Sequence, residues 1–237
     1  MAWRCTGRTN AELISNMRKQ GIISSDRVAA AMSNVDRANY VTRPSTAYQD
    51  SPQPIGHGAT ISAPHMHAYA VEHLLPYLQP GAKVLDVGSG SGYLSAVLHN
   101  LVSPPPSPTQ PHTPQGKVVG IDHISELVEW SKKNLEKDGL GHALRDGRIE
   151  MVTGDGRLGH PADGPYDAIH VGAASPTLPQ ALVDQLKAPG KMFIPVGVSS
   201  QSIWEVEKSA TGEVKKREIM DVMYVPLTDP ERQKRGY

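Results

Sequence analysis

The chain has 237 residues, enough for one α/β domain with a substantial buried core. Its 24 acidic and 24 basic side chains balance, so no overall charge attracts nucleic acid or an anionic membrane. The lone Cys5 cannot form a disulfide within the chain, and no segment resembles a signal peptide or a membrane span. These features predict a cytoplasmic monomer that binds neither nucleic acid nor membranes.

Helical patterns dominate residues 1–80, apart from one long polar stretch. In "TNAELISNMRKQG", Thr9 and Glu12 have the spacing of a capping box, and the following apolar side chains fall on one helix face. The segments "SSDRVAAAMSNV" and "HMHAYAVEHLLPYL" predict two more helices. Between these two, "RPSTAYQDSPQPIGHGATISAP" is rich in Pro, Gly and Ser, which indicates an ordered loop or short strands of the kind that often carry function.

From Lys83 onward, short apolar runs alternate with helical segments. The runs "KVLDVG", "KVVGID", "IEMVTGD", "YDAIHVG" and "KMFIPVG" each close on Gly or Asp, and "GYLSAVLHNLV", "SELVEWSKKNLEKDG" and "PQALVDQLKAPG" have helical spacing. This alternation predicts an α/β fold with a mostly parallel, doubly wound sheet that helices cover on both faces. The later segments "SIWEVEKS" and "MDVMYVPL" predict a C-terminal antiparallel hairpin at the edge of that sheet.

One segment does not follow this alternation. The stretch "SPPPSPTQPHTPQ" at 103–115 holds six of the 20 prolines of the chain. It stands between a predicted helix and the next predicted strand, where a few residues would suffice. We interpret it as a flexible surface insertion with polyproline character, and a ligand for a proline-binding module is the alternative.

The segment "VLDVGSGSG" at 84–92 predicts a ligand-binding turn. Gly88, Gly90 and Gly92 follow an apolar run at alternate positions and precede a helix, where glycines let the backbone approach a ligand closely. The spacing G-x-G-x-G differs from the G-x-G-x-x-G of turns that bind the diphosphate of a dinucleotide. Asp86 stands two residues before the first glycine, where a carboxylate would repel a diphosphate and would suit an ammonium group.

Two more carboxylates follow the next two predicted strands. Once the insertion is discounted, the distance from Gly88 to Asp122 is typical of an acidic residue that accepts ribose hydroxyls. Because the carboxyl ends of parallel strands meet at one edge, we expect Asp86 near an amine, Asp122 on a ribose and Asp155 near an adenine. Together they predict S-adenosyl-L-methionine as the cofactor. Three aspartates that only cap helices or turns are the alternative.

Several segments along nearly the whole chain form a recognisable set: "DSPQPIG", "LDVGSGSG", "GIDHI", "GDGR", "PYDAIHVGAA", "YVPLTD" and, most specific of all, "ATISAPHMHA" at 59–68. With these segments the chain resembles the protein-L-isoaspartate O-methyltransferase family. The resemblance implies a Rossmann-like, S-adenosylmethionine-dependent methyltransferase that methylates the α-carboxylate of L-isoaspartyl residues in damaged proteins. Whether D-aspartyl residues are also substrates stays open. S-adenosyl-L-homocysteine would be the product. The methyl ester would close to a succinimide that returns partly to aspartate, which is protein repair.

The resemblance also implies site residues, with Ser62 in the place of the family's active-site serine. Asp86 is predicted from the glycine turn rather than from the resemblance. The predicted cofactor-binding residues are Ala59, Thr60, Ile61, His67, Asp86, Gly88, Ser89, Gly90, Asp122, His123, Asp155, Gly156, Thr228 and Gln233. The predicted substrate-binding residues are Ser62, Ala63, Val171, Gly172, Ala173, Pro195 and Val196.

A single domain over 1–237 accommodates these predictions. Residues 1–80 would form the N-terminal helical and substrate-gate region, and residues 83–198 would form the cofactor-binding core. Residues 199–237 would supply the C-terminal strands and a tail. Isoaspartate occurs in many sequence contexts, so we expect backbone hydrogen bonds to an extended peptide to carry recognition. For Val171, Gly172 and Ala173, packing in the core or in turns is the alternative.

These residue types suit methyl transfer. A carboxylate with a pKa of about 4 is ionised at neutral pH, so it needs no general base to attack the methyl group of a sulfonium. The site must instead position the reactants, which contributes roughly 7–11 kcal/mol in well-aligned reactions, and no metal is expected. The neutral hydroxyl of Ser62 can hold the carboxylate, whereas Lys or Arg would stabilise the ground state.

Other enzyme classes fit the sequence less well. A dinucleotide-dependent dehydrogenase requires G-x-G-x-x-G, and a serine hydrolase requires G-x-S-x-G around Ser62. His65 and His67 lack further metal ligands at suitable spacing. Two alternatives stay open: an S-adenosylmethionine enzyme for another carboxylate or hydroxyl, and an inactive binding protein that keeps the cofactor pocket.

Overall fold

The computed structural model describes residues 5–105 and 112–229. Residues 106–111 of the predicted insertion and the predicted cofactor residue Gln233 lie outside these ranges. Within them, every helix is too short or too polar to cross a bilayer.

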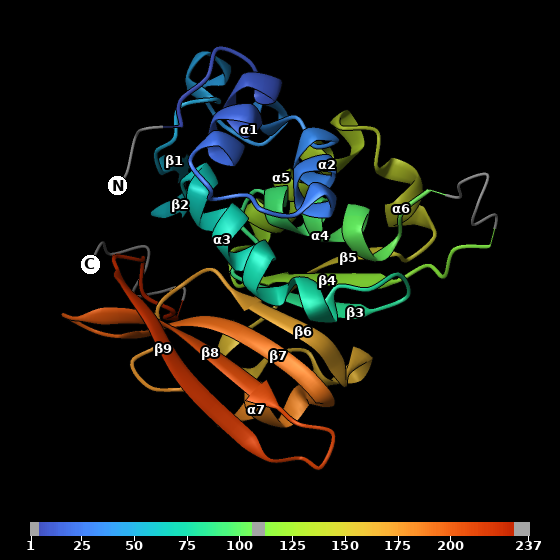
Figure 1. The fold of residues 1–237 in the computed structure, drawn as a ribbon, viewed down its shortest axis with the longest axis vertical. Helices are drawn as coiled ribbons and strands as arrows, with labels where there is room; N and C mark the ends of the chain where they lie inside the picture. The colour runs from blue at the N-terminus through green and yellow to red at the C-terminus, as the bar shows by residue number, and fades with distance from the viewer. Residues whose placement is uncertain (1–4, 106–111, 230–237) are drawn as a thin grey trace.

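Seven strands of the described chain form one mixed sheet (Figure 1). They are β3 (Lys83–Val87), β4 (Lys117–Asp122), β5 (Ile149–Thr153), β6 (Tyr166–Val171), β7 (Leu186–Gly197), β8 (Gln201–Lys208) and β9 (Val214–Val222). Their order across the sheet is β5-β4-β3-β6-β7-β8-β9. Strands β3 to β7 pair in parallel, whereas β8 is antiparallel to both neighbours. The predicted mostly parallel sheet with a C-terminal hairpin is confirmed.

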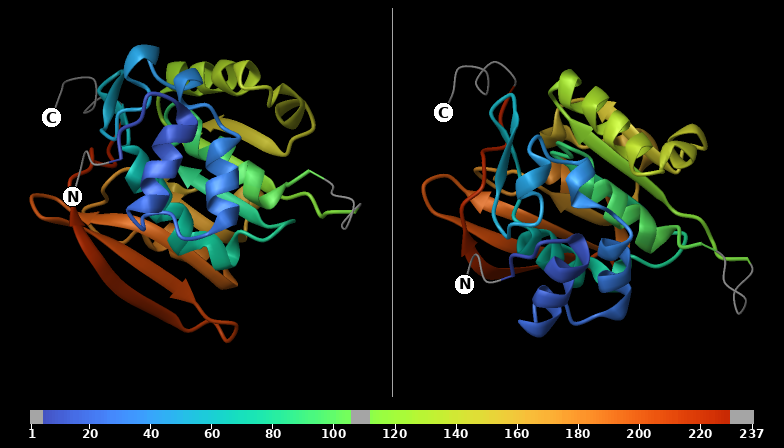
Figure 2. Two further views of the ribbon diagram at one scale, coloured as in Figure 1. Left: turned by 45° about the horizontal axis from the view of Figure 1, so that its top comes forward. Right: turned by 90° about the horizontal axis from the view of Figure 1, so that it is seen from above.

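Helices cover both faces of this sheet. The α-helices are α1 (Asn10–Lys19), α2 (Asp26–Ser33), α3 (Pro64–Leu74), α4 (Tyr93–Val102), α5 (Ser125–Lys137), α6 (Gly141–Arg145) and α7 (Gln180–Gln185). Short 3-10 helices are η1 (Arg37–Asn39), η2 (Pro44–Thr46), η3 (Leu75–Tyr77), η4 (Gly156–Leu158) and η5 (Pro161–Asp163). Figures 1 and 2 show α1 to α6 on one side of the sheet and α7 on the other.

The apolar core divides along the sheet into two clusters. Val84 packs with the buried residues of α1 to α6, whereas its neighbour Leu85 packs with Leu182 and Val183 of α7. Successive side chains of a strand point to opposite faces, so a strand covered on both sides is apolar at nearly every position. This explains why β3 and β4 read as continuous apolar runs.

The first two helices begin where the sequence predicts. The Thr9 hydroxyl accepts a hydrogen bond from the Glu12 amide (3.2 Å), and the Ser25 hydroxyl accepts one from the Arg27 amide (3.1 Å). The capping box of α1 differs in one respect, because the Glu12 carboxylate accepts from the Arg8 amide at 2.9 Å. The reciprocal contact is therefore displaced by one residue toward the N-terminus.

Two predicted elements have different bounds in the structure. The helix predicted over "PQALVDQLKAPG" ends at Gln185, and β7 begins at once at Leu186. Pro189 lacks an amide hydrogen and restricts its predecessor, which favours extended chain there. The last strand runs from Val214 to Val222, earlier than the predicted "MDVMYVPL". Its charged, outward-facing residues hide the strand pattern.

Two segments far apart in sequence close over the carboxyl ends of the central strands. Strands β1 (Gln53–Gly56) and β2 (Ala59–Ile61) form a small hairpin in the predicted loop region. Residues 223–228 leave β9 and run beside Ala174, which donates to the Val225 carbonyl (2.8 Å) and accepts from the Leu227 amide (2.7 Å). Both segments therefore reach the edge where the sheet order reverses between β3 and β6, the usual ligand position in open α/β sheets.

Candidate active site

Two adjoining cavities lie at this edge. Cavity A has about 530 Å³ of empty space, part of it open to solvent, and is lined by Ile55, Ala59, Thr60, Gly88, Gly90, Ile121, Asp122, His123, Gly156, Gly172, Ala173, Val225, Pro226, Leu227 and Thr228. Cavity B has about 350 Å³, also partly open, and is lined by Thr60, Ile61, Ser62, His67, Asp86, Gly88, Ser89, Gly90, Ser91, Tyr93, Leu94, His170 and Gly172. Thr60, Gly88, Gly90 and Gly172 belong to both, so the cavities meet at the glycine turn.

The glycine turn has a backbone that other residues rarely adopt. Gly88 and Gly90 have φ of 73° and 50°, in the left-handed region. The amides of Gly88 and Ser89 donate to the Ile121 carbonyl at the end of β4 (2.8 and 3.1 Å). A Cβ on Gly90 would lie 3.1 Å from Ile55 of the β1–β2 hairpin. The turn therefore bends back on β4, and its left-handed positions lack the side chains that would strain it or press on Ile55.

Asp122 connects the glycine turn to the following helix. Its carboxylate accepts from the Gly90 amide and the Ile124 amide, both at 3.0 Å, and its side chain lines cavity A. Burial raises the pKa of Asp122 above its usual range, and the two backbone hydrogen bonds oppose the rise. The carboxylate is held in one orientation and keeps lone pairs for hydroxyl donors of a ligand.

Asp86 lies within β3 rather than at its end, and it is only 1% exposed. One carboxylate oxygen contacts His170 Nδ1 at 2.8 Å, and the other accepts from the Ser95 hydroxyl at 2.6 Å. Both oxygens already have protein partners, a feature that the sequence did not predict. Asp86 still lines cavity B, so its predicted place near an amine remains a prediction.

Asp155 is engaged differently from the other two aspartates. Its carboxylate caps η4 through the Arg157 amide (3.0 Å) and pairs with the Arg157 guanidinium (Nη2 at 2.7 Å). These hydrogen bonds, with the side-chain bond the strongest, lower the pKa of Asp155. Its neighbour Gly156 lines cavity A, and Asp155 itself does not.

The segment "ATISAPHMHA" passes from cavity A to cavity B. Ala59 and Thr60 line cavity A, and Ser62 and His67 line cavity B, where His67 follows from the first turn of α3. Ala63 is buried at the N-cap of that helix. Burial, and next the charge of Arg37, lower the pKa of His67 well below its usual value, so its imidazole is neutral at pH 7.

The other histidine of this segment points elsewhere. His65 Nδ1 contacts the buried carboxylate of Asp50 at 2.7 Å, and its backbone amide donates to the same oxygen at 3.1 Å. The two imidazoles therefore face different partners. Neither His65 nor His67 belongs to a group of three potential metal ligands among the described residues.

Several residues of the cavities were not predicted from the sequence. They are Ile55, Ile121, Val225, Pro226 and Leu227 in cavity A, and Ser91, Tyr93, Leu94 and His170 in cavity B. Behind cavity B, Arg37 donates to the Ser62 carbonyl at 2.8 Å. Burial raises the pKa of Tyr224 to about 12, and a side-chain hydrogen bond with Ser62 opposes that rise. No local motif marks these residues, apart from the position of Ile121 beside Asp122 and of His170 at a strand end.

The predicted substrate contacts separate into two groups. Gly172 and Ala173 line cavity A. The Val171 side chain is buried in the core cluster on the α7 side of the sheet, and Pro195 is buried in β7. Val196 is half-buried and forms an isolated bridge with Ser175, next to the 223–228 segment. Contacts through the Val171 or Pro195 side chains would require them to leave the core, so only their backbone is available.

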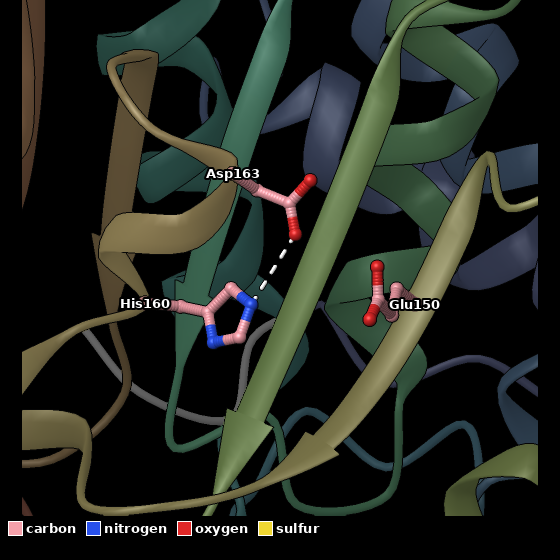
Figure 3. A group of neighbouring side chains, drawn as sticks. All are labelled: Glu150, His160 and Asp163. Carbon is pink, nitrogen blue, oxygen red and sulfur yellow. Dashed lines mark ion pairs between the residues drawn. The ribbon is translucent and has the colours of Figure 1, made fainter.

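A cluster of potential metal ligands lies at the other end of the strands. Figure 3 shows Glu150, His160 and Asp163 together, and His160 Nε2 is 3.2 Å from Asp163. The Lys117 ammonium lies 2.7 Å from Glu150 and 2.5 Å from Asp163. A protein cation thus already contacts both carboxylates, and the cluster is an ion-pair network that joins the amino ends of β4 and β5 to η5.

Comparisons with known proteins agree with this architecture. The family model of protein-L-isoaspartate(D-aspartate) O-methyltransferase (PCMT) matches residues 8–232. The protein-L-isoaspartate O-methyltransferase of Triticum aestivum is 47% identical over 224 residues, which cover 94% of this chain and 93% of that protein. The Caenorhabditis elegans enzyme of the same name is 44% identical, and the match covers 98% of each chain.

A solved structure supports the same relationship. The PCMT of Plasmodium falciparum, crystallised with S-adenosyl-L-homocysteine, has a TM-score of 0.83 to this chain and is 32% identical. The match covers 94% of this chain and 99% of that one. The fold and family expected from the sequence are confirmed: the chain belongs to the protein-L-isoaspartate(D-aspartate) O-methyltransferase family.

Proposed function

We propose that this chain transfers a methyl group from S-adenosyl-L-methionine to the α-carboxylate of L-isoaspartyl residues, and so starts their repair. The observation that carries the proposal is the pair of joined cavities, with the ribose-type carboxylate of Asp122 in one and the Ser62 hydroxyl in the other. The Plasmodium relative binds the product cofactor on the same fold.

The residues of cavity A suit a nucleoside. Asp122 would accept the ribose hydroxyls, and the glycine turn would pass beside the ribose and the sulfur bonded to its C5′. Ile121, Gly156 and Leu227 would contact the adenine with apolar surface. Asp155 remains a predicted neighbour of the adenine through its adjoining backbone, because Arg157 holds its carboxylate.

Cavity B suits the amino-acid arm of the cofactor and the carboxylate that attacks. Its polar lining includes Ser62, His67, Ser89 and Ser91, with Asp86 behind them. When bound, the cofactor supplies a methyl group on a positively charged sulfur. The chain moves no proton in this step, because the attacking carboxylate is already ionised. Ser62 orients that carboxylate, and the surrounding segments exclude water.

The mouth of the site suits an extended peptide. Gly172, Ala173 and Val196 offer small side chains and backbone groups along one side, so recognition depends on the peptide backbone rather than on neighbouring side chains. The substrates are damaged proteins and peptides that carry isoaspartate. The chain acts as a monomer in the cytoplasm, where the single buried Cys5 stays a thiol.

Methyl transfer to paired peptides tests this function. Labelled S-adenosyl-L-methionine should methylate an isoaspartyl peptide and leave its aspartyl twin unlabelled. Ser62→Ala should lower kcat about tenfold or more, since a hydrogen bond to a charged group is lost, while the affinity for S-adenosyl-L-homocysteine stays within about twofold. Ser209→Ala, in the exposed turn between β8 and β9, is the control. Equal labelling of both peptides, or no labelling of either, would exclude the function, and normal kcat in Ser62→Ala would exclude the role of Ser62.

A further inference from the structure

Arg37 is a fully buried cation directly behind cavity B. Its side chain is 0% exposed, and among the described residues it forms no ion pair with a carboxylate. Burial lowers its pKa to about 10, which still leaves the guanidinium protonated at neutral pH. A buried charge without a paired carboxylate is uncommon and destabilising unless other groups satisfy it.

The groups around the guanidinium belong to the proposed site. Arg37 Nη2 donates to the Ser62 carbonyl at 2.8 Å, and Nη1 lies 3.5 Å from His67 Nδ1. The guanidinium carbon lies 5.3 Å from the centre of the Tyr93 ring, in the geometry of a cation–π contact. Ser62, His67 and Tyr93 all line cavity B. One side chain therefore touches three walls of the same cavity.

The segment that carries Arg37 is itself fixed. Arg37 begins η1, and Asp36 caps that turn through the Ala38 amide at 3.0 Å. The Asp138 carboxylate at the end of α5 accepts from Asn39 Nδ2 (2.6 Å) and the Tyr40 hydroxyl (2.9 Å). Together with the Asp36 cap, these hydrogen bonds join η1 to α5, so the position of Arg37 does not depend on any one of them.

The direction of the contact with His67 follows from chemistry. An arginine guanidinium can only donate hydrogen bonds, so the 3.5 Å approach of Arg37 Nη1 favours the tautomer in which His67 Nδ1 is the acceptor. In a neutral imidazole of this tautomer, the proton lies on Nε2. His67 lines cavity B with this ring, which gives the cavity a neutral N–H donor next to the Ser62 hydroxyl.

We propose that Arg37 is a positioning residue that locks His67 in the Nε2–H tautomer and fixes the Ser62 turn, so that cavity B presents neutral donors to a carboxylate. The proposal rests on the proposed function, because that carboxylate belongs either to the amino-acid arm of the cofactor or to the isoaspartyl residue. The positive charge stays behind the donors, which orients the ligand carboxylate without placing a cation directly against it.

The tautomer can be measured without ligand or activity. In the unmodified protein, nitrogen-15 NMR of labelled histidine should show His67 Nδ1 as unprotonated and Nε2 as protonated, with no second form. In Arg37→Met, which keeps the apolar stem and removes the donors, a second population with a proton on Nδ1 should appear. Tyr40→Phe is the matched control, since it removes a buried hydrogen bond of the same segment but leaves the partners of Arg37 intact.

Binding measurements distinguish the two sources of the carboxylate. If it belongs to the cofactor, Arg37→Met should lower the affinity for S-adenosyl-L-homocysteine about fivefold, as measured by calorimetry. The affinity for 5′-methylthioadenosine, which lacks the amino-acid arm, should not change. If it belongs to the substrate, the KM for an isoaspartyl peptide should rise by a similar factor while the cofactor affinity stays the same. Tyr40→Phe should change the melting temperature alone.

Three results would overturn the proposal. They are an Nδ1–H form of His67 in the unmodified protein, an unchanged tautomer in Arg37→Met, and a variant in which only the melting temperature falls. Failure of the proposed function is separate. If the chain methylates no isoaspartyl peptide, but Arg37→Met still changes the His67 tautomer and weakens the binding of S-adenosyl-L-homocysteine, the role of Arg37 stands and only the proposed function fails.

Discussion

Replacing Asp122 by Asn tests the link between the sheet edge and the cofactor. The carboxylate accepts two backbone hydrogen bonds at 3.0 Å, from Gly90 and Ile124. An amide has one acceptor oxygen, so one of these amides would face an NH₂ group. A hydrogen bond to a charged group contributes about 1.5–3 kcal/mol, and relief of the buried charge offsets part of its loss. We expect the free energy of unfolding to fall by about 1–2 kcal/mol.

The same change should lower the free energy of cofactor binding at least as much as it lowers the free energy of unfolding. Two ribose hydroxyls would lose a charged acceptor, for which we expect about 2 kcal/mol, or roughly thirtyfold weaker binding of S-adenosyl-L-homocysteine. Calorimetry gives this affinity, and denaturant unfolding gives the stability. Asp163→Asn is the control, because that carboxylate lies at the opposite end of the strands in contact with Lys117.

The pH dependence provides a second readout. Burial raises the pKa of Asp122, so this group takes up its proton at a higher pH than an ordinary carboxyl. Ribose hydroxyls donate to the ionised form, and the affinity of the unmodified protein should therefore fall as the pH drops through the raised pKa. Asp122→Asn should lack this fall. An unmodified protein whose affinity stays constant between about pH 8 and about pH 5, or an Asn variant that still shows the fall, would refute the ribose assignment.

Two further changes test the packing beneath the site and the C-terminal sheet. Gly156→Ala would place a Cβ 2.5 Å from Val87 Cγ1, so we expect the free energy of unfolding to fall by about 1–3 kcal/mol. We also expect weaker binding of S-adenosyl-L-homocysteine. Normal affinity in this variant would show that the backbone at residue 156 does not border the ligand. At Glu205, burial raises the pKa, but hydrogen bonds from Arg217 and His73 outweigh it and lower the pKa overall. When the pKa of a carboxyl is lower in the folded state, the ionised group stabilises the fold at pH values above its unfolded pKa of about 4.3. This contribution is lost as the pH falls through the folded-state pKa. Glu205→Gln should therefore lower stability by about 1–2 kcal/mol at neutral pH, with the difference shrinking below about pH 4; a difference independent of pH would contradict the ion pairs.

The central strands and the glycine turn follow from local patterns in the sequence. A strand covered on both faces must be apolar at nearly every position, and a backbone with positive φ favours glycine, so the sequence predicts β3, β4 and the turn at Gly88. The edge strand β9 was misplaced, because neither of these constraints applies to its exposed, charged residues.

The walls of cavity B could not be predicted in the same way. Arg37 and Tyr93 reach this cavity from η1 and the start of α4, and no spacing rule relates their positions to Ser62. The pairing of Asp86 with His170 depends on the register of β3 beside β6. The sequence places Asp155 directly after β5, but its ion pair with Arg157 depends on the η4 turn, which no spacing in the sequence predicts.

The walls of cavity A determine when a newly synthesised chain can first bind the cofactor. These walls include Ile55 and Thr60 from the early hairpin and Leu227 and Thr228 from the segment after β9. A nascent chain that extends past Asp122 but stops short of about residue 228 would contain the glycine turn and Asp122 but only an open half-site. Since domains form from their N-terminal side as they emerge, tight cofactor binding would arise only when the last wall arrives, and the bound cofactor would favour completed chains over truncated ones.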